Sequence, residues 1–189
     1  MATEPSKEAL HEIDAWTKPP FLRRVRIRGY KSIAFCDVPL QPLTILVGRN
    51  AAGKSNFIDA LAFLGDALRF NVSEAVKRRG GFPAILCRSA RLRAMSIEIE
   101  AGYSEESAEY LAQYRVEIPA GERGAPECPK EWLSIKQMGS KREIGFDARQ
   151  GKADWFGDGV SQYYGHTSAY SPTHLCLGVL AQPPFLQLA

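Results

Sequence analysis

The residues whose types and spacing could do chemistry lie in one run of eight, from Gly48 to Ser55, with the sequence GRNAAGKS. The run fits the pattern Gly-x-x-x-x-Gly-Lys-Ser, in which successive backbone N–H groups point into one concavity and bind phosphate oxygens. Lys54 is expected to reach the β- and γ-phosphates, and the Ser55 hydroxyl is expected to ligate the Mg²⁺ that bridges them. The sequence therefore predicts a P-loop that binds a nucleoside triphosphate with Mg²⁺.

The loop also indicates which nucleotide is bound. A GTP-binding protein would need a guanine-reading Asn-Lys-x-Asp motif, and none of the asparagines in this chain precedes a lysine. ATP is therefore the favoured ligand. The predicted nucleotide-contacting residues are those of the loop and the residue that follows it: Gly48, Arg49, Asn50, Ala51, Ala52, Gly53, Lys54, Ser55 and Asn56.

A strand before the loop and a helix after it must hold the loop in place. Residues 43–47 (LTILV) form a continuous apolar run, which is typical of a strand buried on both faces. After Ser55, apolar residues recur at helical spacing to about Phe70 and predict an amphipathic helix. Upstream, residues 22–29 alternate apolar with basic residues, and residues 33–38 form a second short strand. The elements therefore occur in the order that a P-loop requires.

The second half of the chain has a different pattern. Four segments are expected to be successive strands separated by turns: residues 95–101, 110–118, 132–137 and 143–148. Short helices are expected at residues 73–79 and from residue 174 to 181. The predicted fold class is α/β: a P-loop NTPase with a mixed sheet around the P-loop helix and an antiparallel β lobe built from residues 95–157.

Composition predicts one domain behind a short leader. The chain has 189 residues, 45% of them apolar, which suffices for a single core. Residues 1–20 end in Pro19-Pro20 and are expected to be a poorly ordered leader, and residues 21–189 are expected to form the domain. Because the sequence has neither a secretory signal nor an apolar stretch of about 20 residues, we expect a cytoplasmic protein with no membrane contact. The four cysteines have no paired spacing and are expected to be reduced thiols.

Charge is unevenly distributed along the chain. The net charge is −2 over residues 1–20, +10 over residues 21–93 and −5 over residues 94–189. The basic segment fits either a polyanionic partner or a solvated surface beside a nucleotide site. Its arginines and lysines have two interpretations: they contact a nucleic-acid backbone, or they are solvated side chains on a strand face and at a helix end. These residues are Arg23, Arg26, Arg28, Lys77, Arg78, Arg79, Arg88, Arg91 and Arg93. Five aromatic residues also have two interpretations, stacking on bases or packing in the core: Trp132, Trp155, Tyr163, Tyr164 and Tyr170.

Two segments carry a family resemblance. Residues 22–33 (LRRVRIRGYKSI) and 43–56 (LTILVGRNAAGKSN) resemble the N-terminal portion of RecF-like and SMC-like ATPases of the AAA type. The resemblance is specific over residues 21–101 and looser beyond. It implies an ABC-type head that binds ATP between the two protomers of a homodimer. It also implies work in DNA repair, recombination or phage defence, with DNA and a nuclease as possible partners.

The resemblance also implies roles for three residues. Lys31 and Ser32 would lie near the nucleotide, and Asn50 would help to position the γ-phosphate or its attacking water. The chain departs from the family after the loop, because no four apolar residues precede an Asp-Glu pair and nothing resembles the LSGGQ signature. The catalytic residues therefore stay unassigned.

From these missing motifs we expect a truncated domain that hydrolyses ATP slowly or not at all. The main alternative is a nonhydrolysing nucleotide-binding or interaction module. A P-loop phosphotransferase is a further alternative, although no acceptor pocket is identified in the sequence. Core surface left exposed by truncation would favour aggregation.

Overall fold

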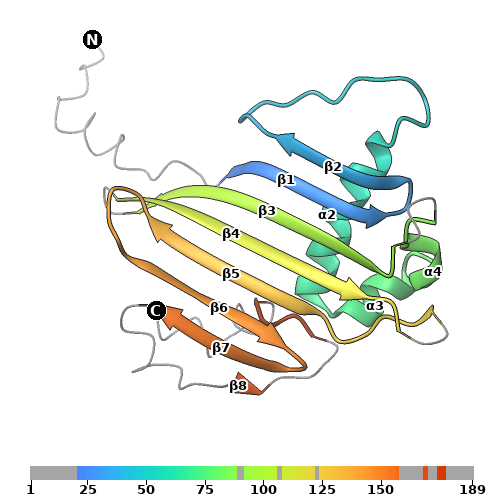
Figure 1. Cartoon of the computed structure of the whole chain (residues 1–189). Helices are drawn as coiled ribbons and strands as arrows, with labels where there is room; N and C mark the ends of the chain where they lie inside the picture. The colour runs from blue at the N-terminus through green and yellow to red at the C-terminus, as the bar shows by residue number, and fades with distance from the viewer. Residues whose placement is uncertain are drawn as a thin grey trace, which may run out of the picture.

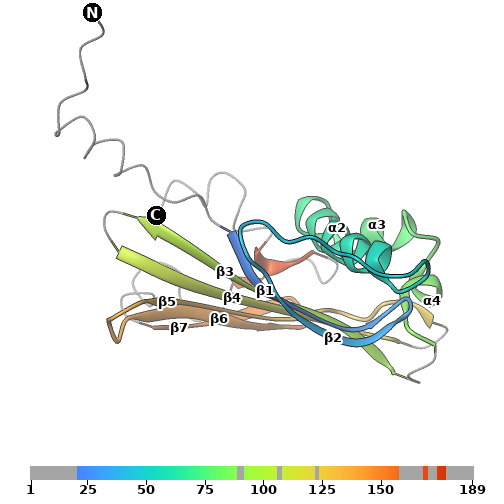
Figure 2. The same cartoon turned by 90° about the horizontal axis from the view of Figure 1, so that it is seen from above.

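The computed structural model describes residues 21–88, 92–105, 108–121, 124–157, 168–169 and 174–177. In this part of the chain, one sheet carries helices on one of its faces (Figures 1 and 2). The strands are β1 (Phe21–Tyr30), β2 (Ile33–Pro39), β3 (Ala94–Glu105), β4 (Ala108–Pro119), β5 (Lys130–Gln137), β6 (Glu143–Arg149), β7 (Lys152–Gly157) and β8 (Ser168–Ala169). The helices are α2 (Lys54–Arg69), α3 (Val72–Lys77) and α4 (Phe82–Ile85).

The sheet is antiparallel at every pairing. Its order is β2-β1-β3-β4-β5-β6-β7-β8, so that β3 to β8 follow one another as a meander. The strand β1 lies between β2 and β3, and the connection from β2 to β3 contains α2, α3 and α4. The strands expected at residues 22–29, at residues 33–38 and between residues 95 and 157 are therefore confirmed.

Alternation along the strands gives the sheet one apolar and one charged face. In β1, Val25 and Ile27 are buried on the helix-covered face, and they lie opposite Ile99 and Ile97 of β3. Arg26 points to the other face, because successive side chains of a strand alternate. The short-range pattern of residues 22–29 thus decides which face of the sheet the helices cover.

The helix α2 packs on the apolar face with a regular row of side chains. Its buried residues recur at helical spacing: Phe57, Ala60, Phe63, Leu64 and Ala67. Burial of each large side chain contributes roughly 1.5–3 kcal/mol. The next helix, α3, begins at a side-chain cap, in which Asn71 Oδ1 accepts a hydrogen bond of 2.8 Å from the Glu74 N–H. These contacts hold α2, which begins directly after the glycine-rich loop, against the sheet.

The structure corrects the prediction for residues 43–47. They form no strand, and Leu43, Ile45 and Val47 are 81%, 74% and 84% exposed. A strand needs a hydrogen-bonded neighbour, and within the described ranges the sheet offers this run none. The expected mixed sheet around the P-loop helix is wrong for the described residues. The antiparallel strands are also no separate lobe, because β1 and β2 continue the same sheet.

Some predictions lie outside the described residues. These are the leader at residues 1–20, the second half (residues 178–181) of the helix expected at 174–181, and the residues Arg91, Tyr163, Tyr164 and Tyr170.

Candidate functional site

The glycine-rich loop leads directly into the N-terminus of α2. Gly53 is the N-cap of that helix and has a φ of 93°, in the left-handed region that favours glycine. Ala51 also has a positive φ, of 64°, so the chain turns twice within three residues. Residues 48–52 and Ser55 are exposed. The loop is therefore open to a ligand at the positive end of the 16-residue helix.

Lys54 folds back over its own loop. Its ammonium group donates hydrogen bonds to the carbonyl oxygens of Gly48 and Arg49, at 2.6 and 2.9 Å. The positive charge thus lies within the concavity of the loop. A phosphate that enters has to replace these two carbonyl acceptors with its own oxygens.

Ser32 lies against the start of α2. Its Oγ accepts a hydrogen bond of 2.6 Å from Asn56 Nδ2, and it would lie 3.6 Å from a Cβ placed on Gly53. The structure therefore brings Ser32, in the turn between β1 and β2, beside the loop. Lys31 lies in the same turn, but its Nζ is directed to Asp59 Oδ2 at 2.6 Å. Its φ of 48° is unusual for a residue with a side chain.

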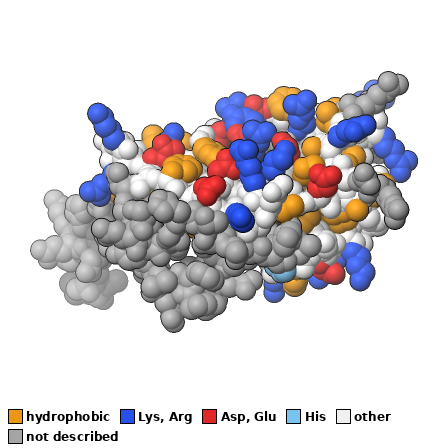
Figure 3. Space-filling view, turned by 60° about the horizontal axis from the view of Figure 1, so that its bottom comes forward, with side chains coloured by type: hydrophobic (Ala, Val, Ile, Leu, Met, Phe, Trp, Pro, Cys, Tyr) orange, Lys and Arg blue, Asp and Glu red, His pale blue; other side chains and the backbone are white. Residues whose placement is uncertain are grey.

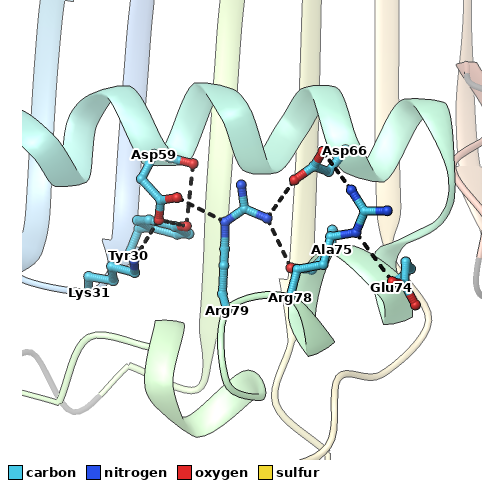
Figure 4. A network of polar contacts seen from close by, with 8 residues as sticks. All are labelled: Tyr30, Lys31, Asp59, Asp66, Glu74, Ala75, Arg78 and Arg79. Atoms are coloured by element: carbon cyan, nitrogen blue, oxygen red, sulfur yellow. Dashed lines mark hydrogen bonds and ion pairs between the residues drawn. The ribbon is translucent and has the colours of Figure 1, made fainter.

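Asp59 is the centre of a polar network that sequence analysis did not single out (Figure 4). Its carboxylate accepts hydrogen bonds from the Tyr30 hydroxyl at 2.6 Å and from Arg79 Nε at 3.1 Å, in addition to the Lys31 contact. Arg79 Nη1 also donates to Asp66 Oδ2 at 2.8 Å and to the Ala75 carbonyl at 3.0 Å. The network therefore joins the turn after β1, the helix α2 and the end of α3. The sequence feature that could have pointed to Asp59 is that it is the only carboxylate within the apolar pattern of residues 57–64.

Charge and burial act in opposite directions on Asp59. Partial burial tends to raise the pKa of its carboxyl group, but hydrogen bonds from Lys31 and Tyr30 and the charge of Arg79 outweigh that effect and lower the pKa below its usual range. Burial, followed by the hydrogen bond to Asp59, raises the pKa of Tyr30. Asp59 is therefore ionised at neutral pH and Tyr30 is a hydrogen-bond donor to it.

One pocket borders the loop, and another borders the turn after β1. One, of about 300 Å³, is largely apolar and is lined by loop residues, by the run 45–47 and by side chains of β2 and α2: Ala52, Gly53, Lys54, Ile33, Cys36, Val38 and Phe57. The other, of about 490 Å³, is lined by Lys31, Ser32, Ala84, Leu86 and Arg88. A larger pocket of about 590 Å³ lies over β3 to β6 on the charged face of the sheet, away from the helix side, and is not part of this site.

Many of the basic residues are already paired with acids. Arg26 forms ion pairs with Asp37, Glu98 and Glu100. On the face that Figure 3 shows, basic and acidic side chains are interspersed. Within the described ranges, Arg28, Arg88 and Arg93 form no ion pair. A solvated, ion-paired strand face therefore accounts for Arg26.

The two tryptophans have different positions. Trp155 packs edge-on against Phe146, with ring centroids 5.3 Å apart, and belongs to the core. Trp132 is half-buried on the opposite face, where it lines the 590 Å³ pocket. The core interpretation is confirmed for Trp155 and not for Trp132.

The described residues also bear on thiols, metal-binding clusters and membrane spans. The four cysteines form no disulfide. In the part of the chain that the structure describes, no group of three or more His, Cys, Asp or Glu side chains is arranged to hold a metal ion. None of the described helices has the length and apolar character to span a membrane.

A helix-covered sheet, with a Gly-x-x-x-x-Gly-Lys-Ser loop at the start of α2, is the arrangement of a nucleotide-binding ATPase domain. Comparison with known families agrees. Residues 21–150 match the model of the AAA ATPase domain, and the chain belongs to this family.

The chain is also similar in sequence to three proteins named "DNA replication and repair protein RecF". The chain is 40% identical to that of Trichlorobacter lovleyi over 55 residues, or 29% of this chain and 15% of the relative. It is 31% identical to that of Pseudarthrobacter chlorophenolicus over 94 residues (43% and 22%), and 31% identical to that of Gloeobacter violaceus over 137 residues (60% and 36%). The chain thus spans 15% to 36% of the length of these relatives, and the expected relationship to RecF-like ATPases is confirmed.

Proposed function

We propose that this chain is the ATP-binding part of a RecF-like ATPase and that it holds Mg²⁺-ATP through residues 48–56. One observation carries the proposal: the loop lies at the N-terminus of α2 with the Lys54 ammonium group inside it. Backbone N–H groups at a helix N-terminus and a lysine point charge together bind phosphate. Family membership supports ATP as the nucleotide.

Different residues of the loop contact different parts of the Mg²⁺-triphosphate group. Lys54 exchanges its carbonyl partners for β- and γ-phosphate oxygens, and Ser55, exposed at the first turn of α2, ligates Mg²⁺. Asn50 helps to position the γ-phosphate or its water. Ser32, hydrogen-bonded to Asn56, lies at the edge of the nucleotide site, and Lys31 lies beside it.

Residues 43–47 have a place in the same proposal. Their apolar side chains and the apolar pocket beside them fit a strand that is buried once further polypeptide covers it. That strand would supply the mixed part of the sheet and would fix the loop from its N-terminal side. A homodimer with ATP at its interface, a role in DNA repair, recombination or phage defence, contacts with DNA or a nuclease, and a cytoplasmic location complete the proposal.

One observation favours the nonhydrolysing alternative for the chain taken alone. The carboxylate nearest to Ser55 on α2 is that of Asp59, and it is bound by Tyr30, Lys31 and Arg79. It is therefore no free base for an attacking water. We accordingly expect binding of ATP without turnover.

Calorimetry on the purified chain tests both parts. Mg²⁺-ATP is titrated into the original chain, into Lys54→Ala and into Lys77→Ala, which removes an exposed lysine of α3. Phosphate release is followed in the same samples. We expect binding that is lost in Lys54→Ala and kept in Lys77→Ala, with no release. Absence of binding by the original chain overturns the proposed function, and turnover that Lys54→Ala abolishes overturns the nonhydrolysing alternative.

A further inference from the structure

Tyr30, the last residue of β1, and the next two residues lie along α2, each closer to the glycine-rich loop than the one before. The Tyr30 ring packs against Phe63, with centroids 5.9 Å apart, and its hydroxyl reaches Asp59. Lys31 contacts Asp59, and Ser32 contacts Asn56. As the chain proceeds from residue 30 to residue 32, the positions that it contacts on α2 move toward the N-terminus of the helix. They are residues 63, 59 and 56 and the cap at residue 53, and they lie on one face of the helix.

On the N-terminal side of the loop, no strand among the described residues supports it. Residues 43–47 are in no strand, and the backbone hydrogen bond within residues 48–52 is a local one of 3.2 Å from Ala52 N–H to the Arg49 carbonyl. The position of the loop therefore depends on how α2 and the turn after β1 are held together. Polar contacts at Asn56 and Asp59 hold them.

We propose that Asp59 is a positioning residue for the phosphate-binding loop: through Lys31 it holds the turn after β1 so that Ser32 stays against Asn56 and Gly53. This inference rests on the proposed function, because the loop it positions is the proposed ATP site. In this inference Asp59 acts through Lys31 and not by direct contact with phosphate or metal.

Arg79 makes the arrangement rigid. Its side chain is only 9% exposed, and it holds Asp59 from the side opposite Lys31 while also binding Asp66 and the Ala75 carbonyl. Among the residues that the structure describes, the charged or titratable groups that contact the Asp59 carboxylate are Tyr30, Lys31 and Arg79. Because three donors share one carboxylate, Lys31 cannot move away without leaving Asp59 partly unpaired.

Asp66 provides a matched control on the same helix. It is similarly exposed (28% against 30% for Asp59) and is also bound by Arg79, but its further partner is Arg78 rather than Lys31. Asp66→Asn therefore weakens the contact between α2 and α3 without touching the turn after β1.

The experiment compares Mg²⁺-ATP affinity in Asp59→Asn, Asp66→Asn, Lys31→Met and the double variant Asp59→Asn/Lys31→Met. We expect Asp59→Asn and Lys31→Met each to weaken binding about tenfold, with the double variant no weaker than either, because both remove the same contact. Asp66→Asn keeps the original affinity. Asp59→Glu, which retains the carboxylate, recovers most of the loss.

Amide hydrogen exchange on the same variants, without nucleotide, separates this inference from the proposed function. We expect Asp59→Asn to speed exchange at residues 53–58, and Asp66→Asn to leave it unchanged there. If the original chain binds no ATP, the proposed function fails, and the exchange comparison alone decides the role of Asp59. Equal effects of Asp59→Asn and Asp66→Asn, on affinity or on exchange at residues 53–58, overturn the inference.

Discussion

The carboxylate of Glu131 accepts a hydrogen bond of 2.6 Å from the backbone N–H of Cys176, which lies 45 residues further along the chain. Both residues are only 2% exposed. Glu131 also accepts hydrogen bonds from the Tyr114 hydroxyl at 2.6 Å and from the Leu177 N–H at 3.4 Å. A buried acid on β5 therefore attaches residues 174–177 to the sheet. Burial, followed by the negative charge of Glu131, raises the pKa of the Cys176 thiol to about 12.

Glu131→Ala is expected to lower the free energy of unfolding by about 3 kcal/mol, because buried donors lose a charged acceptor. Urea unfolding measures the change. Glu117→Ala is the control, since Glu117 forms only part-exposed ion pairs with Arg115 and Lys130, and its loss should cost less than about 1 kcal/mol. Equal losses in the two variants would show that the Glu131 contacts are not formed in solution.

The contribution of Asp59 to stability is expected to depend on pH. Its folded-state pKa is lowered, so the stabilisation is fully present above the unfolded-state value of about 3.9 and is lost as pH falls through the folded-state pKa. Asp59→Asn should therefore cost about 1 kcal/mol at pH 7, a figure reduced for solvent exposure, and much less near pH 2. Urea unfolding at both pH values checks this. A loss that is the same at both would contradict an ionic role.

Residues 43–47 are expected to tolerate a charge. Val47→Lys should change the free energy of unfolding by no more than about 0.5 kcal/mol, because the side chain is already exposed. It should also reduce aggregation, which light scattering detects. Val25→Lys, at a fully buried position of β1, is the contrasting variant and should prevent folding. If Val47→Lys were as harmful, residues 43–47 would be buried in solution.

Any binding of DNA by this chain is expected to use arginines that have no carboxylate partner. Arg28→Ala combined with Arg93→Ala should weaken binding of a DNA duplex and reduce its salt dependence. Arg26→Gln should have little effect, because Arg26 is bound by Asp37, Glu98 and Glu100. Fluorescence anisotropy at several salt concentrations makes the comparison. A larger effect of Arg26→Gln would contradict it.

Local pattern was sufficient to predict most of the elements. Alternation in residues 22–29 predicted β1, and helical spacing after Ser55 predicted α2. It failed for residues 43–47, since an apolar run shows that a strand would be buried but not whether a partner strand is present. The contacts of Asp59 with Arg79, and of Glu131 with Cys176, join residues 20 and 45 positions apart. Such pairs cannot be predicted from local periodicity, because only the tertiary fold brings the two residues together.

The order of the strands also governs how the chain can assemble. Each of the strands β4 to β7 pairs with the strand synthesised immediately before it, so the meander from β3 to β7 can form by successive hairpins while the polypeptide leaves the ribosome. The glycine-rich loop contributes no pairing to that process. Inherited substitutions at the exposed residues 49–52 of the loop should therefore yield a chain that folds and accumulates normally but binds the proposed nucleotide less well.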